Sequence, residues 1–213
     1  MRRGVALLVL LVVPACTTPA DPEAPRAPEV VVGPALPAPP MPETLTPPQW
    51  RVGDRWDYSD EYSITVSEVL ADGATRFRLT DGREQWMLRR AFFVDSSLID
   101  GVTRTVIFRT GNPMQLFSVP TGTPVTYMRE TLRNGETLRH GESWVVEGRE
   151  TVTVPAGTFD CWIVVGRISG LTSRYQGYER WWYSPVARNY VRLEFKYGDS
   201  TESSRVLLSY HLQ

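Results

Sequence analysis

Residues whose side chains could hold a metal are few in this sequence. Two histidines and two cysteines in a chain of 213 residues leave too few nitrogen and sulfur ligands for a structural zinc or an iron–sulfur site. His140 and Glu142 form a pair able to supply two metal ligands, but the sequence indicates no third ligand. We therefore expect His140 to be a solvated histidine in a turn, and we predict no metal and no cofactor.

The nucleophilic side chains do not form a catalytic motif either. Residues 166–170 place Ser169 in the wrong register for a Gly-x-Ser-x-Gly nucleophile elbow. The single lysine, Lys196, belongs to no phosphate-binding loop, and no dinucleotide fingerprint occurs. Cys161 lies in an apolar stretch, so we expect an inert, buried thiol. We predict no catalytic residue and no enzymatic activity; the alternative is a hydrolase whose carboxylates are dispersed in sequence and meet in space.

The charged residues indicate neither calcium nor nucleic-acid binding. The formal net charge is −1, from 23 basic and 24 acidic residues, without the clustered positive surplus that binding to a nucleic-acid backbone requires. Four acidic residues lie close together but lack the spacing of a calcium-binding loop, and we expect them on a solvated strand edge. They are Asp54, Asp57, Asp60 and Glu61.

The first sixteen residues have the pattern of an export signal. Two arginines precede an apolar run over residues 4–13, which is too short to span a bilayer and is typical of a signal-peptide core. Cys16 then follows a small alanine, and this junction resembles the lipobox of bacterial lipoproteins. The resemblance implies a signal peptide over residues 1–15 and a lipid attached to Cys16. The alternative is an ordinary signal peptide, with Cys16 paired to Cys161 in a disulfide.

The residues after Cys16 predict a location and a tether. Thr17 stands where such lipoproteins often carry the aspartate that keeps them in the inner membrane, so the resemblance implies the outer membrane, facing the periplasm. Residues 17–48 hold 11 of the 17 prolines and no aromatic residue, a composition that disfavours regular helix and sheet. We predict a lipidated, disordered tether over 16–48 that spaces a domain from the membrane.

Residues 49–213 contain all seven tryptophans and all nine tyrosines. Apolar and polar residues alternate there with the period of a half-buried strand, and Asx-Gly pairs suit tight hairpin turns. The alternating positions include Trp56, Tyr58, Tyr62, Ile64 and Val66, then Phe77 and Leu79, Trp86 and Leu88, residues 102–108 and 125–132, and Val206, Leu208, Tyr210 and Leu212. The turn pairs are Asp72-Gly73, Asp81-Gly82, Asp100-Gly101 and Asn134-Gly135. We predict one all-β domain over 49–213, an antiparallel meander forming a partly open barrel or a sandwich, in which only residues 84–94 have room for a short helix.

Three motifs within this domain carry a resemblance to a known group of proteins. They are Val-Gly-Asp-Arg-Trp-Asp-Tyr at 52–58, Val-Pro-Ala-Gly-Thr-Phe at 154–159 and Trp-Tyr-Ser-Pro at 182–185. The motifs resemble those of a group of secreted bacterial β-rich domains. The resemblance implies a β-rich envelope domain and no established activity. The residues themselves predict a tight hairpin, because Pro155 presets its φ angle and Gly157 tolerates φ values that other residues avoid.

Large rings on the consecutive residues Trp181, Trp182 and Tyr183 form the predicted contact with a ligand or partner, since exposed aromatic side chains mark recognition surfaces. The simpler interpretation places one face of this strand in the core and the other under a loop. The anchor, the tether and the missing catalytic motif predict an envelope lipoprotein that acts as a non-catalytic binding or scaffold module. Its partner would be another envelope protein or peptidoglycan. The alternative is a carrier that holds a hydrophobic ligand, such as an acyl chain, in a barrel cavity.

Overall fold

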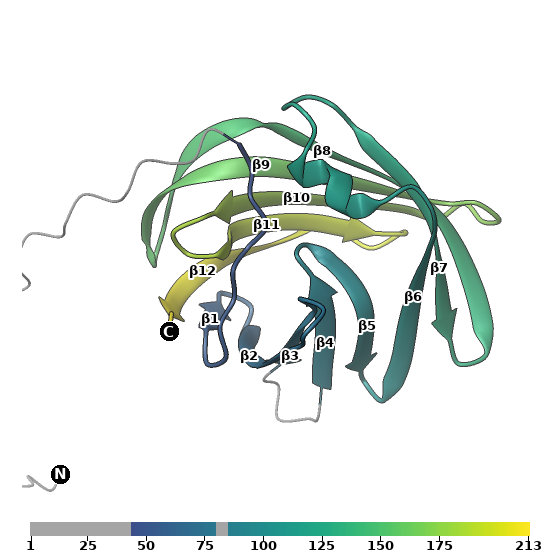
Figure 1. Cartoon of the computed structure of the whole chain (residues 1–213), viewed down its shortest axis with the longest axis horizontal. Coiled ribbons are helices and arrows are strands. Elements are labelled where there is room, and N and C mark those ends of the chain that lie inside the picture. The colour runs from purple at the N-terminus through teal and green to yellow at the C-terminus, as the bar shows by residue number, and fades with distance from the viewer. Residues whose placement is uncertain (1–43, 80–84) are drawn as a thin grey trace, which may run out of the picture. The chain divides into compact units, whose positions relative to one another are not determined.

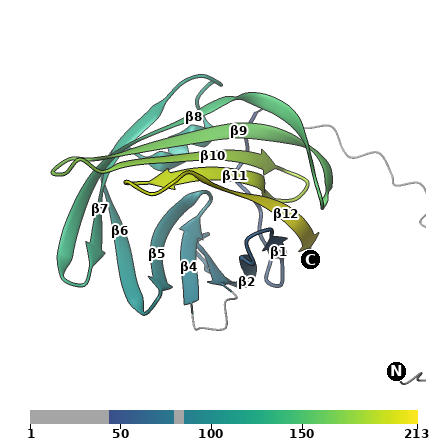
Figure 2. The same cartoon turned by 180° about the vertical axis from the view of Figure 1, so that it is seen from behind.

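The strands of this chain follow one another as an antiparallel meander that closes into a barrel (Figure 1). The computed structural model describes residues 44–79 and 85–213, and within them the meander has twelve strands. The strands are β1 (Arg55–Tyr58), β2 (Ser63–Val69), β3 (Thr75–Leu79), β4 (Gln85–Arg90), β5 (Phe93–Ile99), β6 (Val102–Thr110), β7 (Val125–Arg133), β8 (Glu136–Val154), β9 (Gly157–Gly170), β10 (Gln176–Ser184), β11 (Asn189–Tyr197) and β12 (Ser203–His211). Strand β1 pairs with both β2 and β12, which closes the sheet (Figure 2). The predicted all-β antiparallel meander is confirmed, and its closure is a barrel.

Several sequence predictions concern residues outside the described ranges. They are the signal peptide over 1–15, the lipid attachment at Cys16, most of the tether over 16–48 and the turn at Asp81-Gly82. Leu45, which belongs to the predicted tether, is buried and packs in the core of the barrel, as does Trp50. The packed part of the chain therefore includes residues ahead of position 49.

The barrel has two unequal walls. Strands β8 to β11, which include the two longest strands β8 and β9, form one wall, and β2 to β6 form the wall opposite (Figure 1). Side chains alternate between the inside and the outside along each strand, so every second residue faces the interior. Phe77 and Leu79 on β3 are buried in this way, and so are Val191 and Leu193 on β11. The two walls thus enclose one interior, which is lined by both.

Tight turns connect the strands where the sequence predicts them. Asp100 and Gly101 both have positive φ angles, 53° and 72°, and join β5 to β6. Asn134 and Gly135 do the same between β7 and β8, with φ angles of 49° and 80°. Two consecutive left-handed residues match the twist of a hairpin and favour Asx-Gly pairs. The predicted strands over 102–108 and 125–132 are therefore confirmed.

The hairpin of the Val-Pro-Ala-Gly-Thr-Phe motif also forms. Strand β8 ends before Pro155 and β9 begins at Gly157, so the connection is two residues long. The hydroxyls of Thr153 and Thr158 lie 3.0 Å apart across the hairpin, and Phe159 returns to the core. The amide of Ala156 donates to the carbonyl of β12 residue Leu207, which fixes the turn against the barrel.

The helix expectation for residues 84–94 is wrong. This segment forms the β4–β5 hairpin, and Ala91 at its turn has a φ angle of 50°, which no helix accommodates. The helical turn of the described residues is instead the short 3₁₀ helix η1 (Pro113–Phe117). The side chain of Asn112 accepts a hydrogen bond from the amide of Met114 at 2.9 Å, and proline occupies the first turn. Asn-Pro is a recognisable start signal that the alternation pattern does not reveal.

Two of the three motifs lock onto each other. The turn between β10 and β11, residues 185–188, begins at the proline of the Trp-Tyr-Ser-Pro motif. Two of its carbonyl oxygens accept hydrogen bonds from indoles near the start of the domain. Trp56 Nε1 donates to the carbonyl of Ala187 at 2.6 Å, and Trp50 Nε1 donates to the carbonyl of Arg188 at 2.7 Å. Asp54 forms an ion pair with Arg188 at 3.1 Å. These contacts give the two motifs a structural role: together they form the joint that holds β1 beside the β10–β11 turn.

Candidate ligand-binding site

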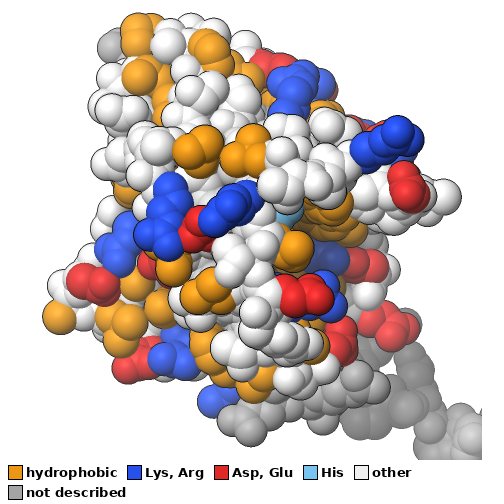
Figure 3. Space-filling view, turned by 90° about the vertical axis from the view of Figure 1, so that its right-hand side faces the viewer, with side chains coloured by type: hydrophobic (Ala, Val, Ile, Leu, Met, Phe, Trp, Pro, Cys, Tyr) orange, Lys and Arg blue, Asp and Glu red, His pale blue; other side chains and the backbone are white. Residues whose placement is uncertain are grey.

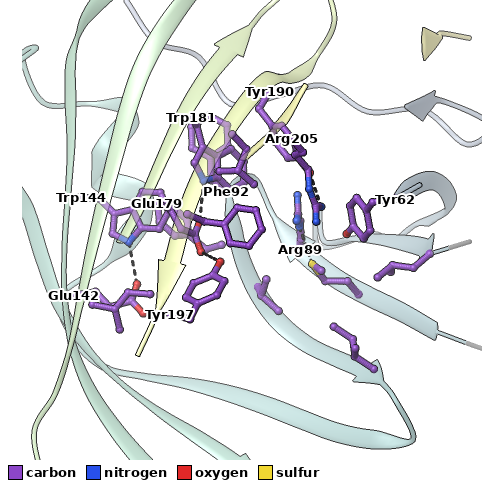
Figure 4. Close-up of a pocket in the computed structure, with 18 of the residues that line it drawn as sticks. Tyr62, Arg89, Phe92, Glu142, Trp144, Glu179, Trp181, Tyr190, Tyr197 and Arg205 are labelled. Carbon is purple, nitrogen blue, oxygen red and sulfur yellow. Dashed lines mark hydrogen bonds between the residues drawn. The ribbon is translucent and has the colours of Figure 1, made fainter. Parts of the chain in front are cut away.

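A cavity of about 710 Å³ lies inside the barrel between the two walls (Figure 4). Strands from β3 to β12 contribute side chains to its lining. A volume of roughly 300–1,000 Å³ is the range of small-molecule sites in proteins. The aromatic members of the lining include Phe92, Phe93, Phe108, Trp144, Trp181 and Phe195, and the charged members include Arg89, Arg129, Glu142, Glu179 and Arg205. The interior therefore combines rings and charges, unlike a uniformly apolar core.

Glu142 is the centre of one buried polar cluster in the cavity wall. Its side chain accepts hydrogen bonds from the Tyr127 hydroxyl at 2.5 Å and from Trp144 Nε1 at 2.9 Å. Arg129 forms an ion pair with the other carboxylate oxygen. The barrel register explains the meeting: Tyr127 on β7 is the direct cross-strand partner of Glu142 on β8, and Trp144 follows two residues later on the same face. Both carboxylate oxygens thus have partners.

Glu179 repeats this arrangement on β10. Trp181 Nε1 donates to one carboxylate oxygen at 2.7 Å, and the hydroxyl of Tyr197 on β11 donates to the other at 2.5 Å. Desolvation of the hydroxyl, and next the negative charge of the adjacent glutamate, raises the pKa of both Tyr127 and Tyr197 above the ordinary tyrosine value, although the Tyr197 residue as a whole is 41% exposed. Both phenols therefore stay protonated at neutral pH and serve as hydrogen-bond donors. Each Glu-x-Trp pair orients an indole that lines the cavity.

Close packing holds the first of these indoles in place. Trp144 lies directly over Gly166, its cross-strand partner on β9. A Cβ atom at position 166 would come within 2.6 Å of the indole ring, a distance that side chains do not tolerate. The glycine is therefore needed for the ring's close approach to the backbone. This role accounts for Gly166, which belongs to the Gly-Arg-Ile-Ser-Gly stretch.

Two arginines face the cavity from the other side (Figure 4). Arg89 on β4 is 6% exposed, and its guanidinium carbon lies 5.6 Å from the centre of the Trp181 ring. Arg205 on β12 forms an ion pair with Asp60 at 2.7 Å and stacks on the ring of Tyr62 at 3.8 Å. Burial raises the pKa of Tyr62 to about 12, so its hydroxyl is neutral at physiological pH.

The structure separates the three aromatic residues predicted as a contact. Trp181 lines the cavity, and it is the one of the three that does so. Trp182 points to the opposite face of the sheet, where it is 5% exposed, donates to Glu150 at 2.7 Å and lies under the guanidinium of Arg192. Tyr183 is buried in the core. The strand thus places one ring at the cavity and covers the other two with protein.

The four acidic residues near the start of the domain, at positions 54–61, are not uniformly solvated. Asp54 is fully buried in its ion pair with Arg188, and Asp60 is held by Arg205 at the cavity. Glu61 is exposed. The expectation of a solvated strand edge is therefore wrong for Asp54, because its carboxylate pairs with Arg188 and so holds the start of the domain against the β10–β11 turn.

His140 occupies a strand and not the solvated turn that the sequence suggests. It is half-buried in β8, with its ring 5.3 Å from the ring of Tyr175. Burial, and next the positive charge of Arg129, lowers its pKa below the ordinary histidine value. The neighbouring Glu142 directs its oxygens to Tyr127, Trp144 and Arg129. Within residues 44–79 and 85–213, no group of three or more His, Cys, Asp or Glu side chains is placed to hold a metal ion.

Cys161 is fully buried on β9, and burial raises the pKa of its thiol from 9.0 to about 12. We expect the thiol of the folded chain to resist iodoacetamide at pH 8 and to react after unfolding in urea, because alkylation requires an accessible thiolate. A Cys16→Ser chain makes Cys161 the single cysteine, so intact mass reports its labelling directly. Since folding raises this pKa, the stability linked to the protonated thiol is complete below about pH 9 and is lost toward pH 12. Labelling of the folded chain as fast as the unfolded one would contradict the expectation.

The sequence did not predict the charged residues as members of a cavity: Glu142 was considered only with His140 as a possible pair of metal ligands. Glu142 and Glu179 each precede a tryptophan by two residues, which puts carboxylate and indole on the same face of a strand. That repeated Glu-x-Trp pattern is the signal that could have identified them. Arg89 carries no such signal, because a charged residue in an alternating strand normally indicates the solvent face.

The outer surface mixes charges of both signs. Arg109 and Arg139 both pair with Glu130, at 2.5 and 3.0 Å. Figure 3 shows basic and acidic side chains near one another among hydrophobic ones on one face of the molecule. In the described part of the chain, no helix has the length and apolar character needed to cross a membrane.

The described residues form a twelve-stranded meander barrel with an internal cavity. Its fold is similar to that of the hypothetical lipoprotein YmcC from Escherichia coli, with a TM-score of 0.52 at 8% sequence identity over 73% of this chain and 83% of that chain. Two further solved structures match with TM-scores of 0.43 and 0.40. The first is a Bacteroides fragilis protein described as a putative exported protein with a YmcC-like fold, at 15% identity over 78% of this chain and 98% of that chain. The second is a Parabacteroides distasonis protein described as a putative lipoprotein, at 17% identity over 79% of this chain and 99% of that chain. No protein-family model and no curated protein matches the chain.

Proposed function

We propose that this chain is a lipid-anchored protein of the bacterial cell envelope, at the outer membrane and facing the periplasm, that binds a small amphiphilic molecule inside its barrel without catalysis. The cavity of about 710 Å³ carries this proposal, because a barrel with purely structural aromatic residues would fill its interior with them. The location is supported by the apolar segment before Cys16 and by the proline-rich segment after it.

The geometry favours a carrier over a scaffold. Trp181, the member of the predicted contact with the best access to a ligand, faces inward, and Trp182 is covered by protein. A contact surface for another envelope protein would need such rings on the outside. The ligand is also not purely hydrophobic, because charged residues line part of the same cavity. An amphiphile, with one polar end and one apolar body, fits both kinds of lining.

The carboxylates of the cavity favour binding over hydrolysis. Glu142 and Glu179 already accept hydrogen bonds from an indole and a phenol each. A general acid or base must exchange a proton with a substrate, and these hydrogen bonds instead hold the side chains as acceptors. We therefore assign both glutamates to the shape of the cavity.

Native mass spectrometry of the full chain carrying Cys16→Ser, purified without detergent, tests this function. We expect a bound small molecule that co-purifies with the parent chain and is absent from Leu193→Trp, because Leu193 lines the cavity and the larger ring fills it. Ile168→Trp fills the cavity from another strand, and Leu208→Trp, at an exposed position on β12, is the matched control that keeps the ligand. A ligand that survives both filling variants, or a parent chain that is bare, would overturn the carrier function.

A further inference from the structure

Arg89 is a buried cation without an anionic partner among the residues that the structure describes. Its residue is 6% exposed, its Nη1 is fully buried, and no hydrogen-bond acceptor reaches that atom. Its Nε lies 2.9 Å from the sulfur of Met87, which is a weak acceptor. None of the carboxylates in the described part of the chain lies within ion-pair distance of this guanidinium. Burying a charge without a partner is strongly unfavourable, so an anion bound beside this guanidinium would be stabilised.

The strand register places Arg89 beside the start of β3. Arg89 on β4 pairs with Thr75, the first residue of β3, whereas Gln85 pairs with Leu79, the last. The unpaired guanidinium faces the cavity.

Arg205 adds a second guanidinium at the same end of the cavity. Figure 4 shows Arg89 and Arg205 close to each other and near Tyr62. The positive charges of both arginines act on the hydroxyl of Tyr62, which agrees with this placement. Arg205 has one carboxylate partner, Asp60, and its Nε is buried without an acceptor. Arg205 thus has one carboxylate partner, and Arg89 has none among the residues that the structure describes.

Besides Asp60, four carboxylates line the cavity, and none of them forms an ion pair with Arg89 or Arg205: they belong to Glu61, Asp100, Glu142 and Glu179. Glu142 is paired with Arg129, and Glu179 directs its oxygens to Trp181 and Tyr197. The rest of the lining near these residues is aromatic and aliphatic, with Phe92, Phe93, Phe108, Trp144 and Ile168. Arg89 is therefore a cation of the cavity wall without an ion pair among the described residues, and the aromatic and aliphatic side chains form the apolar part of the lining.

We propose that Arg89 and Arg205 form an anion subsite, and that the ligand is an amphiphilic anion whose carboxylate or phosphate lies at these two guanidiniums while its apolar body lies among the aromatic rings. This inference rests on the proposed carrier function and specifies its ligand class. Guanidinium groups hold carboxylates and phosphates through paired, charge-assisted hydrogen bonds, and both arginines line the cavity.

Calorimetric titration of the full Cys16→Ser chain with matched twelve-carbon probes tests the inference. The probes are dodecyl phosphate, dodecanoate and the neutral dodecanol, with inorganic phosphate alone as a fourth. We expect at least one anionic amphiphile to bind at least tenfold more tightly than dodecanol and inorganic phosphate, and the comparison of phosphate with carboxylate decides between the two headgroups. We expect Arg89→Met to remove that advantage and Arg78→Met, at an exposed position on the neighbouring strand, to retain it.

Stability separates an anion subsite from a structural role of Arg89. If the guanidinium of Arg89 serves to bind a ligand, the ligand-free Arg89→Met variant should have the same melting temperature as the ligand-free parent chain or a higher one. The reason is that an apolar side chain has replaced a buried charge. A lower melting temperature would contradict the subsite.

In the calorimetric titration, equal affinity for dodecanol and both anions would overturn the anion subsite and leave the carrier function standing. Binding of inorganic phosphate as tight as that of dodecyl phosphate would overturn the amphiphilic ligand. If none of the four probes binds, the ligand class is wrong, and the mass spectrum still decides the carrier function independently.

Discussion

Replacing Trp56 by alanine is expected to lower the free energy of unfolding by ~3–5 kcal/mol, the range for removing a large aromatic side chain from a core. Trp56 is fully buried, and its indole donates to the carbonyl of Ala187 at 2.6 Å. Since Ala187 is itself fully buried, the substitution leaves a cavity and an unsatisfied carbonyl together. A domain of this kind has only about 5–15 kcal/mol of stability in total. Urea unfolding followed by circular dichroism measures the change.

Two further variants show where the effect of Trp56 comes from. Trp56→Phe keeps a ring and removes the N–H donor, so its loss should be smaller than that of Trp56→Ala. Trp86 on β4 is half-buried and lies under the guanidinium of Arg76 at 4.9 Å, an outer-face contact worth about 0.5–1 kcal/mol. Trp86→Ala is therefore the matched control. If it destabilised the chain as much as Trp56→Ala does, the joint between β1 and the β10–β11 turn would not have the role assigned to it.

Glu142→Ala is expected to destabilise the chain by ~3–5 kcal/mol, the cost of removing one member of a buried charge pair. The substitution leaves Arg129 without its ion pair and both Tyr127 and Trp144 without an acceptor. The indole of Trp144 should then lose its fixed orientation in the cavity wall. Urea unfolding measures the stability, and near-ultraviolet circular dichroism reports the packing of the aromatic rings.

The controls for Glu142 separate charge from hydrogen bonding. Glu142→Gln retains an acceptor oxygen and should lose less stability than Glu142→Ala. Glu68 is half-exposed and pairs with Arg76 at 3.1 Å, so Glu68→Ala should cost about 0–1 kcal/mol, as surface ion pairs do. A loss for Glu142→Ala no larger than for Glu68→Ala would mean that the buried cluster does not hold the cavity wall together.

The local parts of the fold could be predicted because local residues determine them. Asp100-Gly101 and Asn134-Gly135 specify turns through their own backbone preferences, and Pro155 does so together with Gly157. Closure of the barrel was not predictable in the same way. It pairs Arg55 with His211, positions at opposite ends of the domain, and no short-range pattern reports such a pairing.

The candidate site was predicted least well, because its interior violates the usual alternation rule. On β4, Trp86 and Leu88 have the apolar character of inward positions, yet Gln85, Met87 and Arg89 line the cavity. An apolar-inside rule assumes a filled core, and a ligand cavity reverses it by placing polar groups inside. Trp181 was predicted as a contact through its ring alone. Its orientation depends on Glu179, and the sequence gives that dependence only as a two-residue spacing.

A crystal structure of the full Cys16→Ser chain grown with dodecyl phosphate tests the central claim most directly, namely that the barrel interior is a binding site for a small amphiphile. We expect electron density for one ligand inside the barrel, with its phosphate oxygens within hydrogen-bond distance of Arg89 and Arg205 and its chain against Trp144 and Trp181. An interior filled by rearranged side chains, with ligand density only on the outer surface, would contradict it.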